Sequence, residues 1–360
     1  MRILHTADLH LGSPLSARLS GERQRERKNE LFNTLSRMAD KAKELGCGAV
    51  IIAGDLFDSE SVTLTDCERV LGIIERYPMI TYFYVSGNHE RGAFSGKIVE
   101  KPNNLIIFGE EWEYYTAADV RIVGRSGTEE GMLDSLAIDR EKKNIVILHG
   151  EPTDKSGRDA VGLKEAMGRG IDYLALGHYH SYRVYDLGDC CHAVYPGSPE
   201  GRGFDEEGEK GFVLIDTDGE HITHRFVPFA ERTLHRIEVD IEGSLRNIEI
   251  EDRIRAALSG IPAKDLVRVE LVGALELESM VDTDAIYSPF KDKYYHFEIK
   301  DRTNIRILPE SYKLDKSLRG EFIRLVSEAE GLSDEDRAFV ATLGIAALMG
   351  EPLRLEEVDK

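Results

Sequence analysis

The segment AVIIAGDLFD, residues 49–58, joins an uninterrupted apolar run to a polar turn. Apolar residues throughout 49–53 are typical of a strand that is covered on both faces. Gly54 and Asp55 then follow where such a strand would end. The opening of the chain, RILHTADLH over residues 2–10, repeats this sequence of strand and polar turn. We therefore expect parallel strands with polar groups at their carboxyl ends.

A helix is predicted between these two strands. Its apolar residues recur at steps of three and four, and a glycine follows as a stop signal: Leu31, Leu35, Met38, Ala42, Leu45 and then Gly46. Further strands are predicted at residues 80–85, 120–123, 144–148, 173–176, 193–195 and 211–216. This repeated pattern indicates an α/β domain. Strands following one another from about 184 to 227 favour a second sheet with antiparallel pairing.

The pattern changes near residues 229–232. Beyond it, strands at 233–241 and 266–273 and a helix at 248–259 suit a small α+β unit. The last part, from 317 to 349, has the periodicity of a helical hairpin. We expect three parts: an α/β domain at 1–230, a smaller α+β unit at 231–312 and a C-terminal helical segment at 313–360.

Composition limits the function classes. The 360 residues are 41% hydrophobic, which excludes disorder and allows a sizeable core. With 46 basic and 66 acidic residues the net charge is −20, so any nucleic acid must be held by a local patch or by metal ions. No run is long and apolar enough for a membrane span. Four cysteines without a CxxC pair favour a reducing cytoplasm.

Five short motifs carry the chemistry, each directly after a predicted strand: Asp8-Leu9-His10, Gly54-Asp55-Leu56-Phe57-Asp58, Gly87-Asn88-His89-Glu90, His149-Gly150 and Gly177-His178-Tyr179-His180. Ligands gather at the carboxyl ends of strands in α/β folds. Taken singly, each motif is more typical of a turn, a helix cap or a buried polar residue. Their joint occurrence in this order predicts a dinuclear metal site.

These motifs resemble the signature of the calcineurin-like metallophosphoesterase superfamily. The opening residues 2–12, the turn Tyr195-Pro196-Gly197-Ser198-Pro199 and the later Gly208-Glu209-Lys210-Gly211 are similar to its SbcD-type DNA repair exonucleases and their YhaO-like relatives. The resemblance implies a four-layer αββα sandwich with a smaller α+β capping domain and a C-terminal helical tail. It also implies phosphodiester hydrolysis by a two-metal mechanism.

The resemblance further implies the ligands of each metal. Asp8, His10, Asp55 and His180 would hold the first, and Asp55, Asn88, His149 and His178 the second, with Asp55 bridging. Oxygen and imidazole ligands without thiolate favour Mn²⁺, with Fe²⁺ and Zn²⁺ as alternatives. His89 would stabilise the phosphoryl oxygens or protonate the leaving alkoxide, and Asp58 would orient His89.

Basic residues near the motifs are candidates for substrate contacts: Arg18, Arg91, Arg125 and Arg202. The segment 18–28 carries five basic and two acidic residues, which fits either a solvated helix start or a contact to a DNA backbone. By resemblance, the expected partners are DNA, an SbcC-like coiled-coil ATPase and a second copy of the chain.

Other functions remain open at this point. The same metal chemistry would serve a small-molecule or cyclic-nucleotide phosphodiesterase, which differs only in the rim of the site. Glu90 completes a GNHE motif as in protein Ser/Thr phosphatases, but Ser59-Glu60 stands where those enzymes have Arg-Gly. A scaffold with structural metals is the third class. The preferred prediction is a DNA exonuclease with some single-strand endonuclease activity.

Overall fold

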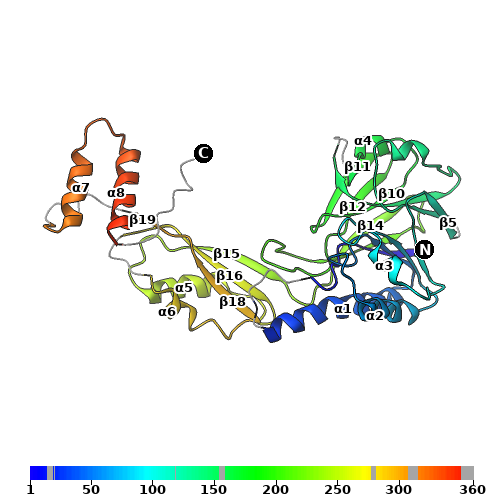
Figure 1. Cartoon of the computed structure of the whole chain (residues 1–360), viewed down its shortest axis with the longest axis horizontal. Coiled ribbons are helices and arrows are strands. Elements are labelled where there is room, and N and C mark those ends of the chain that lie inside the picture. The colour runs from blue at the N-terminus through cyan, green and yellow to red at the C-terminus, as the bar shows by residue number, and fades with distance from the viewer. Residues whose placement is uncertain are drawn as a thin grey trace. The chain divides into compact units, whose positions relative to one another are not determined.

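The structure is a computed structural model, and it describes residues 1–13, 19, 21–117, 119–153, 159–276, 281–306 and 315–349. The chain divides into two compact units, Met1–Leu234 and His235–Lys360. The helices and strands of both units are drawn in Figure 1. Each unit has its own hydrophobic core. We therefore describe the two units separately.

The first unit contains two six-stranded sheets. The first sheet has the order β14-β13-β1-β2-β3-β4. Its strands are β1 (Arg2–Thr6), β2 (Cys47–Ala53), β3 (Thr81–Val85), β4 (Leu105–Ile107), β13 (Gly211–Asp216) and β14 (Thr223–Pro228). The first four run parallel, whereas β13 lies antiparallel to β1 and β14 antiparallel to β13.

The second sheet has the order β11-β12-β10-β7-β6-β5. Its strands are β5 (Glu113–Ala117), β6 (Val120–Gly124), β7 (Lys143–His149), β10 (Tyr173–Gly177), β11 (Arg183–Gly188) and β12 (Cys191–Tyr195). The four central strands are parallel, and the edge strands β5 and β11 are antiparallel to their neighbours. A short pair, β8 (Glu151–Pro152) and β9 (Ala160–Val161), follows β7.

Helices cover the outer face of each sheet. The first sheet is covered by α1 (Gly21–Glu44), α2 (Leu64–Glu75) and α3 (Ala93–Lys97), and the second by the 3₁₀ helix η1 (Met132–Ser135) and α4 (Leu163–Ala166). Side chains alternate along β2: Val50 and Ile52 pack under the helices, while Ile51 packs between the sheets with Ile147 of β7. This two-sided burial explains the apolar run, and the four layers confirm the expected αββα sandwich.

The strands between residues 184 and 227 do not form a sheet of their own, which corrects the sequence prediction. β11 and β12 pair antiparallel in the second sheet, whereas β13 crosses to the first sheet. There Ile3 of β1 lies opposite Ile215 of β13. Local pattern identified the strands, but the choice of partner depends on which sheet edge is still unpaired.

The second unit is built on a three-stranded sheet in the order β15-β16-β18. Its elements are β15 (Leu234–Asp240), α5 (Asn247–Ala257), β16 (Leu266–Val272), β17 (Ala274–Glu276), α6 (Thr283–Tyr287), β18 (His296–Asp301) and β19 (Asn304–Arg306). β17 and β19 form a separate parallel pair. Ile250 and Ile254 of α5 pack with Val267 and Val269 of β16 in one core.

A helical hairpin, α7 (Leu318–Glu328) and α8 (Asp334–Met349), follows in the same unit. Ile323 and Val326 of α7 pack against Ala341 and Ile345 of α8 in a small cluster of their own. None of the helices in the described residues is long and apolar enough to cross a bilayer.

Candidate metal centre

The polar motifs all lie at the carboxyl ends of parallel strands in the first unit. Asp8 and His10 follow β1, Asp55 follows β2, and Asn88 follows β3. His149 ends β7 in the second sheet, and His178 and His180 follow β10. The two sheets pack face to face through a shared apolar layer. All seven predicted ligands are therefore brought to the same edge of the sandwich.

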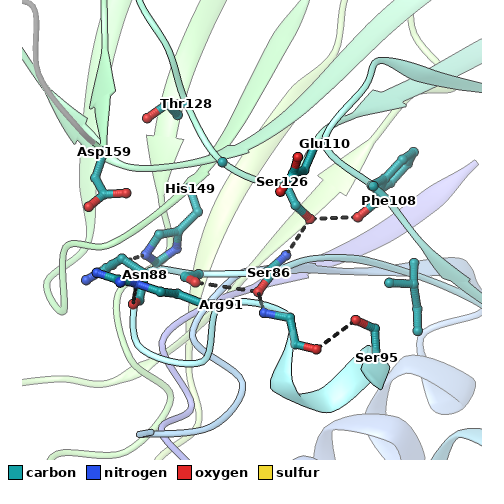
Figure 2. Close-up of a pocket in the computed structure, with 15 residues that line it drawn as sticks. Ser86, Asn88, Arg91, Ser95, Phe108, Glu110, Ser126, Thr128, His149 and Asp159 are labelled. Atoms are coloured by element: carbon teal, nitrogen blue, oxygen red, sulfur yellow. Dashed lines mark hydrogen bonds between the residues drawn. The ribbon is translucent and has the colours of Figure 1, made fainter. Parts of the chain in front are cut away.

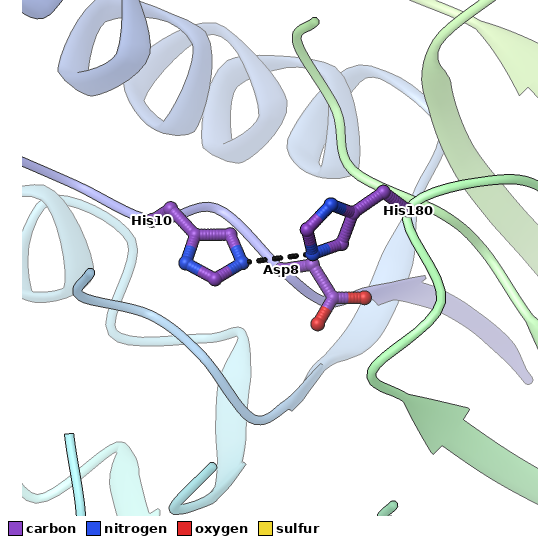
Figure 3. A group of neighbouring side chains, drawn as sticks. All are labelled: Asp8, His10 and His180. Carbon is purple, nitrogen blue, oxygen red and sulfur yellow. Dashed lines mark hydrogen bonds between the residues drawn. The ribbon is translucent and has the colours of Figure 1, made fainter. Parts of the chain in front are cut away.

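The predicted first site is formed by Asp8, His10 and His180, whose potential ligand atoms lie within 4.8 Å of one another (Figure 3). The Nε2 atoms of His10 and His180 face each other at 3.1 Å. The Oδ2 atom of Asp55 lies 3.8 Å from His10 Nε2. Asp8 and His10 are fully buried, whereas His180 is partly exposed.

The predicted second site lies on the other side of Asp55. Its Oδ2 atom is 3.3 Å from His149 Nε2, and this same nitrogen is 2.9 Å from Asn88 Oδ1. His178 Nδ1 lies 3.3 Å from Asn88 Oδ1. Asp8 also groups with Asp55 and His149. One oxygen of Asp55 thus stands between the two sets, in a position suited to a bridging ligand.

The motif backbones have unusual conformations. Asp8, His10, Asp55 and His178 have φ values of 53°, 44°, 48° and 116°, a region that non-glycine residues rarely adopt. Hydrogen bonds between the loops hold them there. The amide of His178 donates to both carboxylate oxygens of Asp8, at 2.9 and 3.1 Å, and the amide of His89 donates to Asp55 Oδ1 at 3.1 Å.

Two motif glycines are required by close approach. A Cβ atom on Gly87 would lie 2.0 Å from Asp55 Oδ1, and one on Gly54 would lie 2.2 Å from His149 Nδ1. Neither position has room for a side chain, because a predicted ligand occupies the space. The glycines of these motifs therefore allow the ligands to approach the neighbouring backbone.

The outer nitrogens of two histidines are fixed by acceptors. His149 Nδ1 donates to the carbonyl of Ala53 at 2.9 Å, and His180 Nδ1 donates to Glu206 Oε1 at 2.8 Å. A proton on Nδ1 leaves the Nε2 lone pair of each ring directed at the shared space. This is the arrangement that metal-binding histidines need.

The charges of the site residues and their pKa shifts favour the binding of cations. Burial raises the pKa of Asp8 to about 7, and burial lowers the pKa of His10 to about 4. Burial alone would lower the pKa of His149, but the negative charges of Asp55 and Asp8 outweigh it and raise that pKa to about 9. The buried carboxylates that favour a protonated His149 would equally stabilise divalent cations, and oxygen and imidazole donors suit such ions, so the residues present fit a metal pair.

His89 lies beside the predicted ligands, and it groups with His10 and Asp58, whose potential ligand atoms lie within 4.8 Å of one another. Its side chain is 42% exposed, and its Nε2 atom is 4.0 Å from Asp55 Oδ2. Its Nδ1 atom donates to the main-chain carbonyl of Asp58 at 3.1 Å. The Asp58 carboxylate instead lies 3.1 Å from His10 Nδ1 and 2.8 Å from Arg202 Nη1. The predicted His89–Asp58 pairing therefore runs through the main chain, and the side-chain pairing is corrected.

The predicted substrate arginines differ in their surroundings. Arg125 is buried and pairs with Glu129 at 2.9 Å, so it is not available to a substrate. Arg202 pairs with Asp58 and Glu206 and is likewise not available to a substrate. Arg91 is exposed, beside the Asn88 carbonyl. Arg18 lies outside the described residues.

The basic segment at the start of α1 also contributes to the interior. Arg27 is buried, pairs with Glu30 and donates to the Gly201 carbonyl at 2.7 Å. Glu30 in turn pairs with Arg232. Arg27 therefore ties α1 to the loop before β13, and it is removed from the set of candidate DNA contacts.

Sequence reasoning missed two buried glutamates. Glu206 binds His180 and Arg202. Glu90, noted only as part of a GNHE motif, accepts from the amides of Leu56 at 3.1 Å, Phe57 at 2.7 Å and Gly87 at 3.3 Å. Glu90 therefore joins the two motif loops after β2 and β3. Its place three residues after Gly87 was the available signal, whereas Glu206 carried no periodic or motif signal.

A cavity of about 440 Å³ adjoins the second site (Figure 2). Asn88, Arg91 and His149 lie on one side of it, and Glu110 and Phe108 lie on the other. The amide of Ser86 donates to Ser126 Oγ at 2.9 Å, which closes part of the wall. The cavity gives a substrate room beside the predicted ligands.

A two-sheet sandwich that gathers Asp, Asn and His side chains at one edge defines a class of dimetal phosphoester hydrolases. The calcineurin-like phosphoesterase family model matches residues 1–182, half of the chain, and the chain belongs to this family. The expected superfamily is confirmed. Members of this family use two divalent metals.

Individual relatives agree with this assignment. The chain is 27% identical to the DNA double-strand break repair protein Mre11 of Methanosarcina acetivorans over 285 residues, which cover 73% of this chain and 44% of that protein. It is 26% identical to the uncharacterized metallophosphoesterase YhaO of Bacillus subtilis over 259 residues, covering 67% and 63%. The matches thus include less than two thirds of either relative. A dimetal phosphatase from Danio rerio is 10% identical, with a TM-score of 0.43, covering 62% of this chain and 95% of that structure.

Proposed function

We propose that this chain is a metal-dependent DNA nuclease, acting as an exonuclease with single-strand endonuclease activity in DNA repair. The observation that carries the proposal is the position of Asp55, whose Oδ2 atom lies 3.8 Å from His10 and 3.3 Å from His149. The similarity to Mre11 supports DNA as the substrate. Family membership supports phosphodiester hydrolysis.

The seven ligands divide between two cations in the proposal. Asp8, His10, Asp55 and His180 would hold the first, and Asp55, Asn88, His149 and His178 the second. The mixture of oxygen and imidazole donors supports Mn²⁺, with Fe²⁺ and Zn²⁺ as alternatives. When bound, two such cations neutralise phosphate oxygens and activate water as a nucleophile.

His89 is the proposed catalytic residue of the protein itself. Its Nδ1 atom is held by the Asp58 carbonyl, which fixes the ring and leaves Nε2 next to Asp55. A proton on Nε2 would be donated to a phosphoryl oxygen or to the departing alkoxide. Asp58 contributes its carbonyl to His89 and its carboxylate to His10.

A small-molecule or cyclic-nucleotide phosphodiesterase is the second candidate. The cavity of about 440 Å³ beside Asn88 and His149 favours it, because a volume of this order accepts one small ligand. Arg125 and Arg202 pair with acidic side chains, which removes two expected contacts to a DNA strand. This also favours the second candidate.

Partners are part of the same proposal. Besides DNA, we propose an SbcC-like coiled-coil ATPase and a second copy of the chain. The α7–α8 hairpin supports a protein partner, because Leu318, Leu325 and Phe339 are exposed there. Action in the cytoplasm, expected from the cysteine content, also stays within the proposal.

The test compares three substrates in the presence of Mn²⁺: end-labelled linear DNA, bis-p-nitrophenyl phosphate and 2′,3′-cyclic nucleotides. We expect stepwise shortening of the DNA, and no turnover by Asp55→Asn. Turnover of the small esters with intact DNA would replace the nuclease by the second candidate.

A further inference from the structure

Behind the predicted first metal site, side chains from three separate loops form a continuous series of contacts. Asp58, after β2, lies 3.1 Å from His10 Nδ1 and 2.8 Å from Arg202 Nη1. Arg202, between β12 and β13, pairs with Glu206 at 2.6 Å. Glu206 accepts from His180 Nδ1 at 2.8 Å. The series thus begins and ends at the two histidines whose Nε2 atoms face each other at 3.1 Å.

Glu206 and Arg202 favour opposite tautomers of the His180 ring. Glu206 Oε1 and Arg202 Nη2 lie 2.8 and 3.1 Å from the same nitrogen, His180 Nδ1. A carboxylate only accepts and a guanidinium only donates. Pairing with Glu206 places the proton on Nδ1 and leaves Nε2 free to bind a cation. Pairing with Arg202 would place the proton on Nε2, where it would block a cation.

The contacts of Glu206 decide this competition. Glu206 is 7% exposed. Its Oε1 atom accepts from His180 Nδ1 at 2.8 Å and from Arg202 Nη2 at 2.6 Å. Arg202 also donates to Glu206 from its main-chain amide, at 3.0 Å, and from Nε, at 2.9 Å. Arg202 thus donates to Glu206 from three atoms and to Asp58 from Nη1, whereas only Nη2 lies near the His180 ring.

The loop that carries His180 is fixed by a further contact. Lys210 is buried, and its Nζ atom donates to the His180 carbonyl at 2.6 Å. The main chain and the ring of His180 are thus held by different residues of one segment, 202–210. A purely structural ion pair would not need to terminate on the outer nitrogen of a predicted ligand.

We propose that Glu206 and Arg202 are positioning residues for the first metal site, with Glu206 setting the tautomer of His180 and Arg202 linking it to the Asp58 carboxylate on His10. The inference rests on the proposed two-metal function. It adds that the affinity of one cation depends on a carboxylate that is not itself a ligand. Residues outside a ligand set commonly change metal affinity by about 10- to 100-fold.

The test measures Mn²⁺ binding to the full chain by titration calorimetry, for the wild type, Glu206→Ala, Glu206→Gln and Arg202→Ala. Glu209→Gln is the matched control, because Glu209 is an exposed acid of the same loop. For Glu206→Ala we expect one of the two sites to weaken about 10- to 100-fold while the other is unchanged. Glu206→Gln should lose less, since its amide oxygen still accepts from Nδ1. Glu209→Gln should match the wild type.

A second readout reports the tautomer directly. In the metal-free protein, ¹⁵N NMR of the histidine rings should place the His180 proton on Nδ1 in the wild type and on Nε2 in Glu206→Ala. Unchanged binding of both ions, equal weakening of both sites, or an unmoved proton in the folded variant would overturn the inference. If Glu206→Ala does not fold, Arg202→Ala decides by the same titration, with selective weakening expected and unchanged affinities contradicting. A wild type that does not bind two ions would instead remove the proposed function.

Discussion

The predicted ligands are held in place by the protein before any ion is considered. Asp8, His10 and Asp55 all have positive φ values, a conformation that costs about 1–3 kcal/mol at each non-glycine residue. The amide of Asp8 donates to the Gly54 carbonyl at 3.1 Å, and that of His10 to the Asp55 carbonyl at 2.9 Å. These hydrogen bonds offset the strain and fix the side chains toward one space.

The first prediction separates catalysis from metal binding. His89→Ala should lower the hydrolysis rate by about 10²- to 10⁴-fold, because the proposed role of the ring is to donate a proton and not to hold an ion. Metal content, measured by mass spectrometry of the purified protein, should stay at the wild-type value. Asp55→Asn should lose both metal and turnover, since Asp55 lies between the two sites. Equal metal loss in the two variants would make His89 a ligand.

At the scale of elements, the loop between β3 and α3 connects the two sets of ligands. It carries Asn88 and His89, and its Glu90 accepts from two amides of the loop after β2 and from the Gly87 amide of its own loop. A buried carboxylate with three donors keeps these loops at a fixed separation. The geometry of the site therefore depends on how closely the loop can approach Asp55.

Gly87→Ala tests that approach. The added Cβ would lie 2.0 Å from Asp55 Oδ1 and 2.4 Å from the Asp55 amide, so the loop must shift. A displacement of this kind should reduce kcat/KM by about 100-fold. Gly96→Ala is the control, because Gly96 lies in α3 and has no heavy atom within 4 Å of an added Cβ. The control should retain activity and gain about 0.5–1 kcal/mol of stability. An unchanged kcat/KM in Gly87→Ala would show that the loop can shift without disturbing the site.

A cross-strand ion pair stabilises the second unit. Arg268 of β16 lies opposite Glu298 of β18, and the two side chains form a salt bridge. Burial would raise the pKa of Glu298, but hydrogen bonds from His296 and Arg268 outweigh it and lower that pKa to about 2. Because the folded pKa lies below the unfolded value of about 4.5, this stability is present above pH 4.5 and is lost as pH falls toward 2.

Glu298→Gln should therefore destabilise the second unit near neutral pH. Since the pair is partly solvated, we expect a loss of about 1 kcal/mol at pH 7. Chemical denaturation at several pH values should show the difference from the wild type shrinking below pH 4.5. A difference that stays constant down to pH 3 would mean that the carboxylate charge does not contribute.

At the scale of the whole molecule, the first unit buries the contacts between its two sheets while leaving polar loops at one edge. The ligands come from both sheets, so any cation bound there joins the two halves of the sandwich. Ligands that bind only the folded state stabilise it by mass action. Metal binding and folding of this unit are therefore linked.

Removal of metal should reveal this linkage. Chelation with EDTA should stop hydrolysis and lower Tm, and Mn²⁺ at about 100 times its Kd should restore about 2.7 kcal/mol per site. Differential scanning calorimetry would measure the shift. Asp55→Asn should respond little to EDTA, since it has already lost its ions. An identical Tm with and without Mn²⁺ in the wild type would contradict the link.

Local pattern was sufficient for the α/β class and for the polar side chains at the strand ends, whereas the four-layer sandwich was expected from the family resemblance. Two-sided burial requires the apolar runs at β1 and β2, and parallel strands place their carboxyl ends at one edge. The motif that ends in Asp58 could thus be assigned to the site from its position after β2. Arg125 could not be assigned in this way, because its pairing with Glu129 depends on a turn that the motifs do not specify.

The amino-acid sequence by itself determined the strands, their ends and the Asp, Asn and His side chains that follow them, because these features follow from periodicity and from short turns. The tertiary structure alone decided which side chains each polar group contacts. Asp58 contacts His10 and Arg202, and Glu206 contacts His180, because residues 26 to 144 positions apart in the chain meet only after the sheets have packed.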